Sequence, residues 1–275
     1  MQLSRVIIYS FFSFLFLVSC AGNNAYHKTN KLYKKRAKGF SKQLLRQPAN
    51  DITADSFKTA KWVGATNFNL RKPNYVIIHH TAQKSCSQTL KTFTNDSSKV
   101  SAHYVICKDG TLQHMLNDYL RAWHAGVGKW GNNSDINSSS VGIEIDNNGT
   151  EPFTTAQLNV LESVLAKLKK DHGIPPANFI GHSDIAPTRK VDPNVNFPWK
   201  YFAEKGYGNW YDDTTGIDLP PGFNQLHALR IIGYDVKDSI AATQAFRRHF
   251  LTSNTKGGFT DVEKKVLYMV MRKFL

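Results

Sequence analysis

An apolar run that ends in two histidines limits most strongly what this chain can fold into. Tyr75 to His79 combine an aromatic residue with three β-branched ones and no acidic or basic residue before the histidine, which is typical of a buried strand. About a hundred residues later, the segment from Gly181 to Pro193 holds a histidine, a lysine and an aspartate in one loop constrained by proline. Because functional side chains gather where strands end, two imidazoles and one carboxylate are predicted to meet around a zinc ion with an open fourth position.

Strand and helix patterns alternate between residues 62 and 211. Alternation of this kind predicts an α/β domain, with a mixed central sheet flanked by helices. A hydroxyl cap in Phe153-Thr154-Thr155-Ala156-Gln157 opens the longest predicted helix, and Gly173 ends it. The predicted strands are Tyr75–His79, Val141–Asp146, Phe179–Gly181 and the hairpin His103–Cys107 with Thr111–His114, and a further helix is predicted over Ser87–Thr94.

A small helical domain is predicted at residues 223–275, after a linker at residues 212–222 that is rich in Pro, Gly and Thr. Apolar residues recur there at helical spacing in three segments, Phe223–Ile232, Ser239–Phe250 and Thr260–Phe274. These segments predict a three-helix, all-α domain. The alternative is a helical appendage packed on the main domain.

Residues 1–20 have the basic, hydrophobic and small-residue zones of an export signal. The ending Leu17-Val18-Ser19-Cys20 resembles the lipobox of bacterial lipoproteins, in which Cys20 is lipidated and becomes the mature N-terminus. The alternative is an ordinary cleaved signal. Ala21 after the cysteine favours the outer membrane, facing the periplasm. In that oxidising compartment Cys86 and Cys107 could form a disulfide, and free buried thiols remain the alternative.

The positive charge of the chain is concentrated behind Cys20. The chain has a net charge of +14, and residues 21–61 are predicted to be a basic tether, solvated and poor in apolar periodicity. No helix-turn-helix, zinc-finger or RNA-binding signature accompanies the lysines, so no nucleic-acid partner is expected. Anionic membranes or envelope polymers fit the charge better.

The metal ligands predicted from these patterns are His79, His182 and Asp192. His80 competes with His79, but adjacent residues of a strand face opposite ways, so only one of the two should reach the metal. Each of these histidines could also be structural.

Two further side chains are candidates for catalysis. Glu144 lies in the apolar run Val141–Asp146, where a carboxylate is costly unless it has a purpose. Burial raises its pKa towards the range that a general base needs; the alternative is a core glutamate held by a salt bridge. Lys190 lies between two predicted ligands and could donate to an oxyanion, although alone it would be taken for a surface lysine.

Residues 62 to 205 resemble the type-2 N-acetylmuramoyl-L-alanine amidases, zinc amidases of peptidoglycan related to T7-type lysozyme and to peptidoglycan recognition proteins. The resemblance rests on Ile78-His79-His80-Thr81-Ala82, Ser101-Ala102-His103-Tyr104, Asp109-Gly110, Ala122-Trp123-His124-Ala125-Gly126, Val141-Gly142-Ile143-Glu144, Gly181-His182-Ser183-Asp184-Ile185-Ala186-Pro187 and Arg189-Lys190-Val191-Asp192-Pro193.

The resemblance implies residue roles. It implies zinc on His79, His182 and Asp192, an acid/base at Glu144 and an oxyanion-stabilising lysine at Lys190. An aspartate as third ligand resembles the bacterial amidases rather than the animal recognition proteins. Val191 and Asn194 depart from the threonine and glycine common in the family, which affects only loop detail.

Three residues of these motifs are candidate substrate contacts. Trp123 and His124 match a motif that lines the family's cleft, and His103 is either a substrate contact or a structural histidine. The segments Leu229–Tyr234 and Ala245–Phe250 resemble a three-helix peptidoglycan-binding module, with Arg247 in place of the usual glutamine.

The implied activity is hydrolysis of the amide between N-acetylmuramic acid and L-alanine in peptidoglycan or muropeptides, by a monomer held to the membrane through its lipid anchor. The alternatives are a non-catalytic peptidoglycan-binding lipoprotein on the same fold and a peptidase that cuts within the stem peptide.

Overall fold

The computed structural model describes residues 25–45, 65, 67, 69, 70 and 72–275. Contacts divide the chain into two units, Met1–Thr66 and Asn67–Leu275. The predicted signal sequence and Cys20 lie outside the described residues. None of the helices among the described residues is both long and apolar enough to cross a membrane.

The described part of the first unit is one helix, α1 (His27–Leu44), with no buried residue. It falls within the predicted tether. Lys, Arg, Gln and Leu favour helix, and Gly39 is the single glycine of the segment, which contains no proline. The segment is solvated as predicted, but it is helical and does carry apolar periodicity, because Tyr33, Ala37, Phe40 and Leu44 recur at helical spacing.

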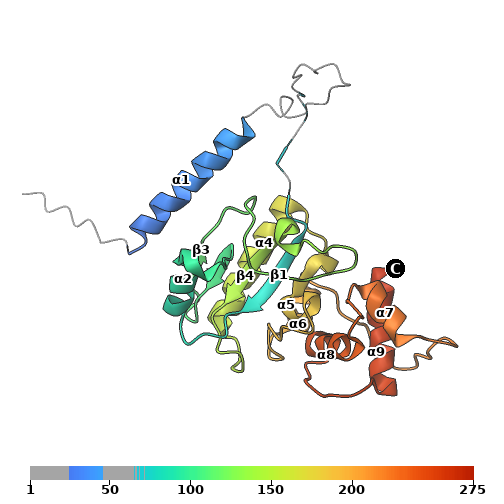
Figure 1. The fold of residues 1–275 in the computed structure, drawn as a ribbon. Coiled ribbons are helices and arrows are strands. Elements are labelled where there is room, and N and C mark those ends of the chain that lie inside the picture. The colour runs from blue at the N-terminus through green and yellow to red at the C-terminus, as the bar shows by residue number, and fades with distance from the viewer. Residues whose placement is uncertain (1–24, 46–64, 66, 68, 71) are drawn as a thin grey trace, which may run out of the picture. The chain divides into compact units, whose positions relative to one another are not determined.

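A mixed five-stranded sheet organises the second unit (Figure 1). Its order is β3-β2-β4-β1-β5, in which β2, β4, β1 and β5 are parallel and β3 is antiparallel to β2. The strands are β1 (Tyr75–His80), β2 (Tyr104–Ile106), β3 (Leu112–His114), β4 (Ser140–Ile145) and β5 (Phe179–Gly181). The predicted α/β class and the predicted strands are therefore confirmed, with shifts of one residue or so at several ends.

Helices cover this sheet. The longest, α4, begins with a capping box between Thr154 and Gln157 and ends at Gly173, whose φ of 66° suits glycine. The helices of this unit are α2 (Cys86–Thr94), α3 (Ile136–Ser139), α4 (Thr155–His172), α5 (His182–Ile185), α6 (Trp199–Glu204), α7 (Gln225–Ile232), α8 (Ser239–Phe250) and α9 (Asp261–Met271), with short 3-10 turns η2 (Asp96–Ser98), η3 (Pro176–Asn178) and η4 (Arg272–Phe274).

The two faces of the sheet are buried in two hydrophobic clusters. Val76 and Ile78 of β1 belong to a cluster with α4 and α6, whereas Ile77, on the opposite face, belongs to a cluster that includes α7, α8 and α9. Figure 1 shows these three C-terminal helices grouped together. They match the three predicted helical segments, and their core is continuous with that of the sheet.

A disulfide joins Cys86, the first residue of α2, to Cys107, which follows β2. Of the two alternatives that the sequence left open, the structure shows the bridge.

Candidate active site

The strand register brings the predicted site residues to one edge of the sheet. His79 of β1 is paired with Glu144 of β4, and Ile78 is paired with Gly181, the last residue of β5. His182, the residue after Gly181, is therefore level with His79 along the strand direction. Parallel strands present their carboxyl ends at the same edge, which is where α/β folds bind ligands.

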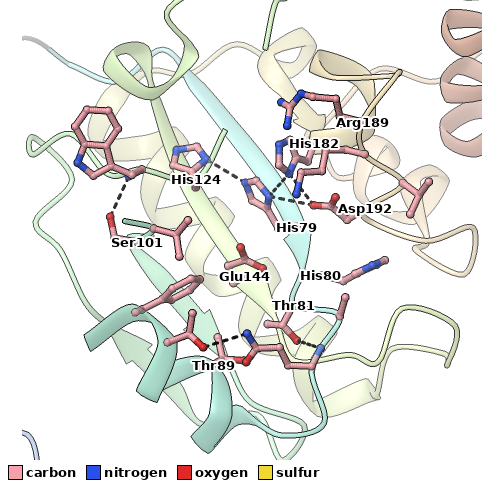
Figure 2. Close-up of a pocket in the computed structure, with 18 residues that line it drawn as sticks. His79, His80, Thr81, Thr89, Ser101, His124, Glu144, His182, Arg189 and Asp192 are labelled. Atoms are coloured by element: carbon pink, nitrogen blue, oxygen red, sulfur yellow. Dashed lines mark hydrogen bonds and ion pairs between the residues drawn. The ribbon is translucent and has the colours of Figure 1, made fainter. Parts of the chain in front are cut away.

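Two histidines and one aspartate converge there (Figure 2). The Nδ1 atoms of His79 and His182 lie 2.9 Å apart, and the Oδ2 atom of Asp192 lies 3.1 Å and 3.0 Å from them. All three residues are buried, and they form the one group among the described residues whose donor atoms could hold a metal ion.

Hydrogen bonds assign the tautomer of His182. Its Nε2 lies 3.0 Å from the carbonyl oxygen of Ala125, and a carbonyl only accepts, so Nε2 carries the proton. In a neutral imidazole the other nitrogen then bears a lone pair. The Nδ1 of His182 therefore directs its lone pair towards Asp192 and His79.

A relay of hydrogen bonds assigns the tautomer of His79. The hydroxyl of Ser140 donates to Ile136 O at 2.6 Å, so its oxygen is free to accept from His124 Nε2 at 3.2 Å. His124 Nδ1 must then accept from His79 Nε2, 3.0 Å away. The Nδ1 of His79 is left with its lone pair facing His182.

The charge states fit a metal ligand set. Burial, and then the charge of His182, lowers the pKa of His79 to about 4. Burial opposes ionisation of Asp192, but the neighbouring imidazoles of His182 and His79 outweigh it, and the pKa of Asp192 is lowered. Two lone pairs and a carboxylate oxygen about 3 Å apart repel one another unless a cation lies between them, and nitrogen and oxygen donors of this kind suit zinc.

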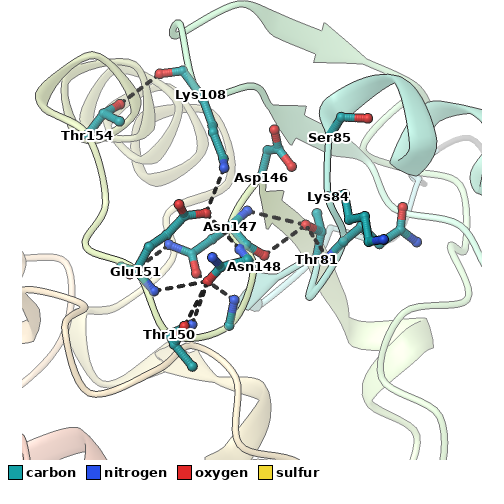
Figure 3. Close-up of polar contacts among 12 residues, drawn as sticks. Thr81, Lys84, Ser85, Lys108, Asp146, Asn147, Asn148, Thr150, Glu151 and Thr154 are labelled. Atoms are coloured by element: carbon teal, nitrogen blue, oxygen red, sulfur yellow. Dashed lines mark hydrogen bonds and ion pairs between the residues drawn. The ribbon is translucent and has the colours of Figure 1, made fainter.

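His80 lies on the other side of the strand, as predicted. Its Nδ1 accepts from the backbone N–H of Asn194, 3.1 Å away, two residues after Asp192. The Asn194 side chain donates to Asn147 Oδ1 at 3.1 Å, and Asn147 N donates in turn to Thr81 Oγ1 at 3.3 Å (Figure 3). His80 thus supports the loop that carries Asp192.

Glu144 points into the same pocket. Its Oε2 atom is buried with no hydrogen-bond partner among the described residues. Burial, with the charge of Asp192 as a smaller cause, raises the pKa of Glu144 to about 8 against the opposite effect of Lys190. Within the described part of the chain no ion pair of Glu144 is found, so the alternative of a salt-bridged core glutamate is not favoured.

The pocket has a volume of about 350 Å³. Lys190 and Trp123 line it, and Trp123 is 56% exposed, with the Arg121 guanidinium 4.1 Å from its ring centroid. No individual role is predicted from the sequence for most of the other lining residues. These other residues are Thr81, Ala82, Gln83, Thr89, Thr92, Phe93, Val100, Ser101, Arg189 and Val191.

The two histidines predicted as candidate substrate contacts, His124 and His103, have different environments in the structure. His124 lines the pocket but is 8% exposed, and both of its ring nitrogens are engaged by His79 and Ser140. His103 lies outside the pocket lining. It is fully buried, with Nε2 donating to Leu120 O and Nδ1 accepting from Gly142 N, which favours its structural alternative.

No role is predicted from the sequence for Asp184, two residues after His182. Its Oδ1 accepts from Tyr234 OH at 2.8 Å, and its Oδ2 accepts from Gly181 N and His249 Nδ1 at 2.7 Å each. Asp184 is completely buried. The C-terminal helices therefore contact the short helix that begins with His182.

A buried set of donor atoms that could hold a metal ion, at a strand edge beside a glutamate of raised pKa, is the arrangement expected of a hydrolytic active site. Comparisons give the particular class. A family model described as N-acetylmuramoyl-L-alanine amidase matches residues 69–195. The N-acetylmuramoyl-L-alanine amidase AmiD of Escherichia coli K12 is 30% identical over 209 residues, 64% of this chain and 74% of that protein. The chain belongs to the N-acetylmuramoyl-L-alanine amidase family and is an enzyme of that class.

Other relatives agree. The 1,6-anhydro-N-acetylmuramyl-L-alanine amidase AmpD of Haemophilus influenzae is 35% identical over 105 residues, 38% of this chain and 57% of that protein. The structure of E. coli AmiD with anhydro-N-acetylmuramic acid-L-Ala-D-gamma-Glu-L-Lys has a TM-score of 0.65 and 26% identity, over 81% of this chain and 97% of that one. The crystal structure of AmpDh3 from Pseudomonas aeruginosa has a TM-score of 0.68 and 28% sequence identity, over 81% of this chain and 98% of that one.

Proposed function

We propose that this enzyme hydrolyses, with zinc, the amide bond between N-acetylmuramic acid and the L-alanine of the peptidoglycan stem peptide. The observation that carries the proposal is the register of His79 with Glu144 beside the ligand atoms of His182 and Asp192. It sets a proton acceptor next to a metal ligand set in one pocket. The relatives named for this bond, and the AmiD complex with an anhydromuramyl peptide, support the choice of substrate.

The protein groups have distinct roles in this proposal. His79, His182 and Asp192 hold the zinc ion, which when bound supplies Lewis acidity that polarises a carbonyl and makes water a better nucleophile. Glu144 takes the proton of the attacking water and passes it to the leaving amine. Lys190 donates to the oxyanion of the tetrahedral intermediate.

Substrate contacts are proposed for the exposed side of the pocket. Trp123 offers an exposed ring on which a sugar or peptide can stack. His124 is proposed to act through His79, because both of its ring nitrogens are engaged within the protein.

Mass spectrometry of digested muropeptides tests the proposal. Zinc-loaded enzyme and its Glu144→Ala variant are incubated with anhydro- and ordinary muropeptides and with intact sacculi. Free stem peptide beginning at L-alanine, formed by the wild type alone, is expected. Cleavage within the stem peptide would identify a peptidase instead, and binding without cleavage would favour the non-catalytic alternative.

We also propose that Cys20 is lipidated, that the enzyme is held at the outer membrane facing the periplasm, and that it acts as a monomer in which residues 223–275 help to bind peptidoglycan. The lipobox-like ending at Cys20 and the disulfide between Cys86 and Cys107 support an exported enzyme. Intact mass of the membrane-extracted protein tests lipidation, and replacing Cys20 with Ala should abolish the added acyl mass.

A further inference from the structure

Helix α1 has a strongly one-sided charge. It carries seven basic residues and no acidic residue in 18 positions, and at 1.5 Å per residue it is about 27 Å long. The helix buries none of its residues. The basic residues are Lys28, Lys31, Lys34, Lys35, Arg36, Lys38 and Lys42.

An apolar stripe runs along the same helix. Tyr33, Ala37, Phe40 and Leu44 follow the spacing i, i+4, i+7 and i+11, which at 100° per residue places them within about 60° of arc. Phe40 is 52% and Leu44 is 74% exposed. No lysine or arginine falls within the stripe, so the helix has one apolar face and one cationic face.

Charge decides which surface can cover this helix. A second copy of α1 would bring two sets of seven cations together. The unit Asn67–Leu275 has 24 Lys and Arg against 19 Asp and Glu, so it too is positive. A soluble polyanion would satisfy the lysines but leave Phe40 and Leu44 in water. A bilayer with anionic headgroups satisfies both faces.

We propose that α1 binds the surface of a membrane that contains anionic lipid. The helix lies parallel to the bilayer, with Tyr33, Phe40 and Leu44 at the boundary between headgroups and acyl chains and the lysines on the headgroups. Six residues lie between Cys20 and His27, so the seven steps from one to the other reach at most about 25 Å. The proposal does not depend on the amidase activity, and it predicts binding without a lipid on Cys20.

Vesicle cosedimentation tests the proposal with a chain that begins at Ala21, which lacks Cys20 and the hydrophobic run before it. The compact unit Asn67–Leu275 has its own core and is retained whole. We expect binding to phosphatidylcholine vesicles that contain phosphatidylglycerol, loss of binding at high salt and little binding to phosphatidylcholine alone. Helicity measured by circular dichroism should rise on binding.

Two triple variants separate the two faces. The apolar-stripe variant replaces three residues by serine, and the charge variant replaces three lysines by glutamine. Each variant should weaken vesicle binding about tenfold or more, because an interfacial helix needs both the burial of its apolar face and the attraction of its cations to anionic lipid. The substitutions are Tyr33→Ser, Phe40→Ser and Leu44→Ser in the first variant, and Lys31→Gln, Lys35→Gln and Lys42→Gln in the second.

A charge-matched control removes three exposed lysines from the compact unit, by Lys170→Gln, Lys237→Gln and Lys256→Gln. It should bind vesicles like the wild type. Equal loss in this control, or wild-type binding by the apolar-stripe variant, would overturn the proposal in favour of unspecific charge attraction. A dimer in analytical ultracentrifugation that the apolar-stripe variant abolishes, without vesicle binding, would overturn it in favour of a second copy.

Discussion

His249 of α8 donates its Nδ1 proton to Asp184 Oδ2 at 2.7 Å, and both side chains are buried. Asp184 belongs to α5, the four-residue helix that begins with His182. A residue of the C-terminal helices is therefore bonded to the helix that begins with one of the three proposed metal ligands.

His249→Phe should lower zinc affinity, but by less than the roughly ten- to hundredfold loss typical of removing a partner bonded directly to a ligand, because Asp184 accepts from Gly181 N and not from the His182 ring. Phenylalanine keeps the stack on Trp199, whose ring centroid is 3.9 Å away, but cannot donate to Asp184. Competition with a chelator measures the affinity. His227→Phe, at an exposed histidine of α7, is the matched control, and equal affinity in both variants would show that α8 does not position His182.

Glu144 predicts a pH dependence of stability in the metal-free protein. Its pKa is about 8 in the folded chain against an ordinary value of 4.5, so between these values the folded state binds the extra proton. The free energy of unfolding should therefore fall as pH rises through this window, by up to about 1.4 kcal/mol per pH unit. Glu144→Gln removes this loss.

Thermal unfolding of the metal-free wild type and Glu144→Gln across this window measures the effect. The melting temperature of the variant should gain on that of the wild type as pH increases. A constant difference would mean that Glu144 is already ionised in the folded protein.

Lys190→Ala should lower kcat on the order of a hundredfold or more while zinc content stays unchanged, because an oxyanion donor acts in the transition state. No hydrogen bond or ion pair of its ammonium is found among the described residues, so its removal leaves no partner unsatisfied. Lys170→Ala, outside the pocket, is the control. If Lys190→Ala turned over substrate at the wild-type rate, Lys190 would not be the oxyanion donor.

Gly142→Ala should disturb the support of His79. A Cβ at Gly142 would lie 2.4 Å from the Cγ atom of His124, so the ring of His124 must move away from its bond with His79. We expect lower stability and weaker zinc binding, measured by thermal unfolding and chelator competition. Ser140→Ala removes the acceptor of His124 Nε2 without adding an atom, and it should weaken zinc binding with a smaller loss of stability.

The convergence of the proposed metal ligands can be predicted from the sequence because His79 and Glu144 stand out as polar side chains in apolar strand patterns. Asp184 was not, since its partners Tyr234 and His249 are 50 and 65 residues away along the chain and no local pattern connects them. The sequence predicts His124 as a substrate contact from its match to a cleft-lining motif. That motif carries no information about Ser140, whose bond with His124 forms only in the folded protein.

The shared hydrophobic cluster makes the C-terminal helices and the sheet one cooperative unit. Ile77 and Ile180 of the sheet lie in the same cluster as Leu229, Phe246 and Leu267 of the three helices, so neither part can lose its packing alone. In evolution and in engineering, these helices should therefore not be exchangeable as an independent domain. A graft that replaces them must also replace the apolar residues on the sheet beneath. Otherwise the recipient will unfold in two steps, with its metal site lost in the first.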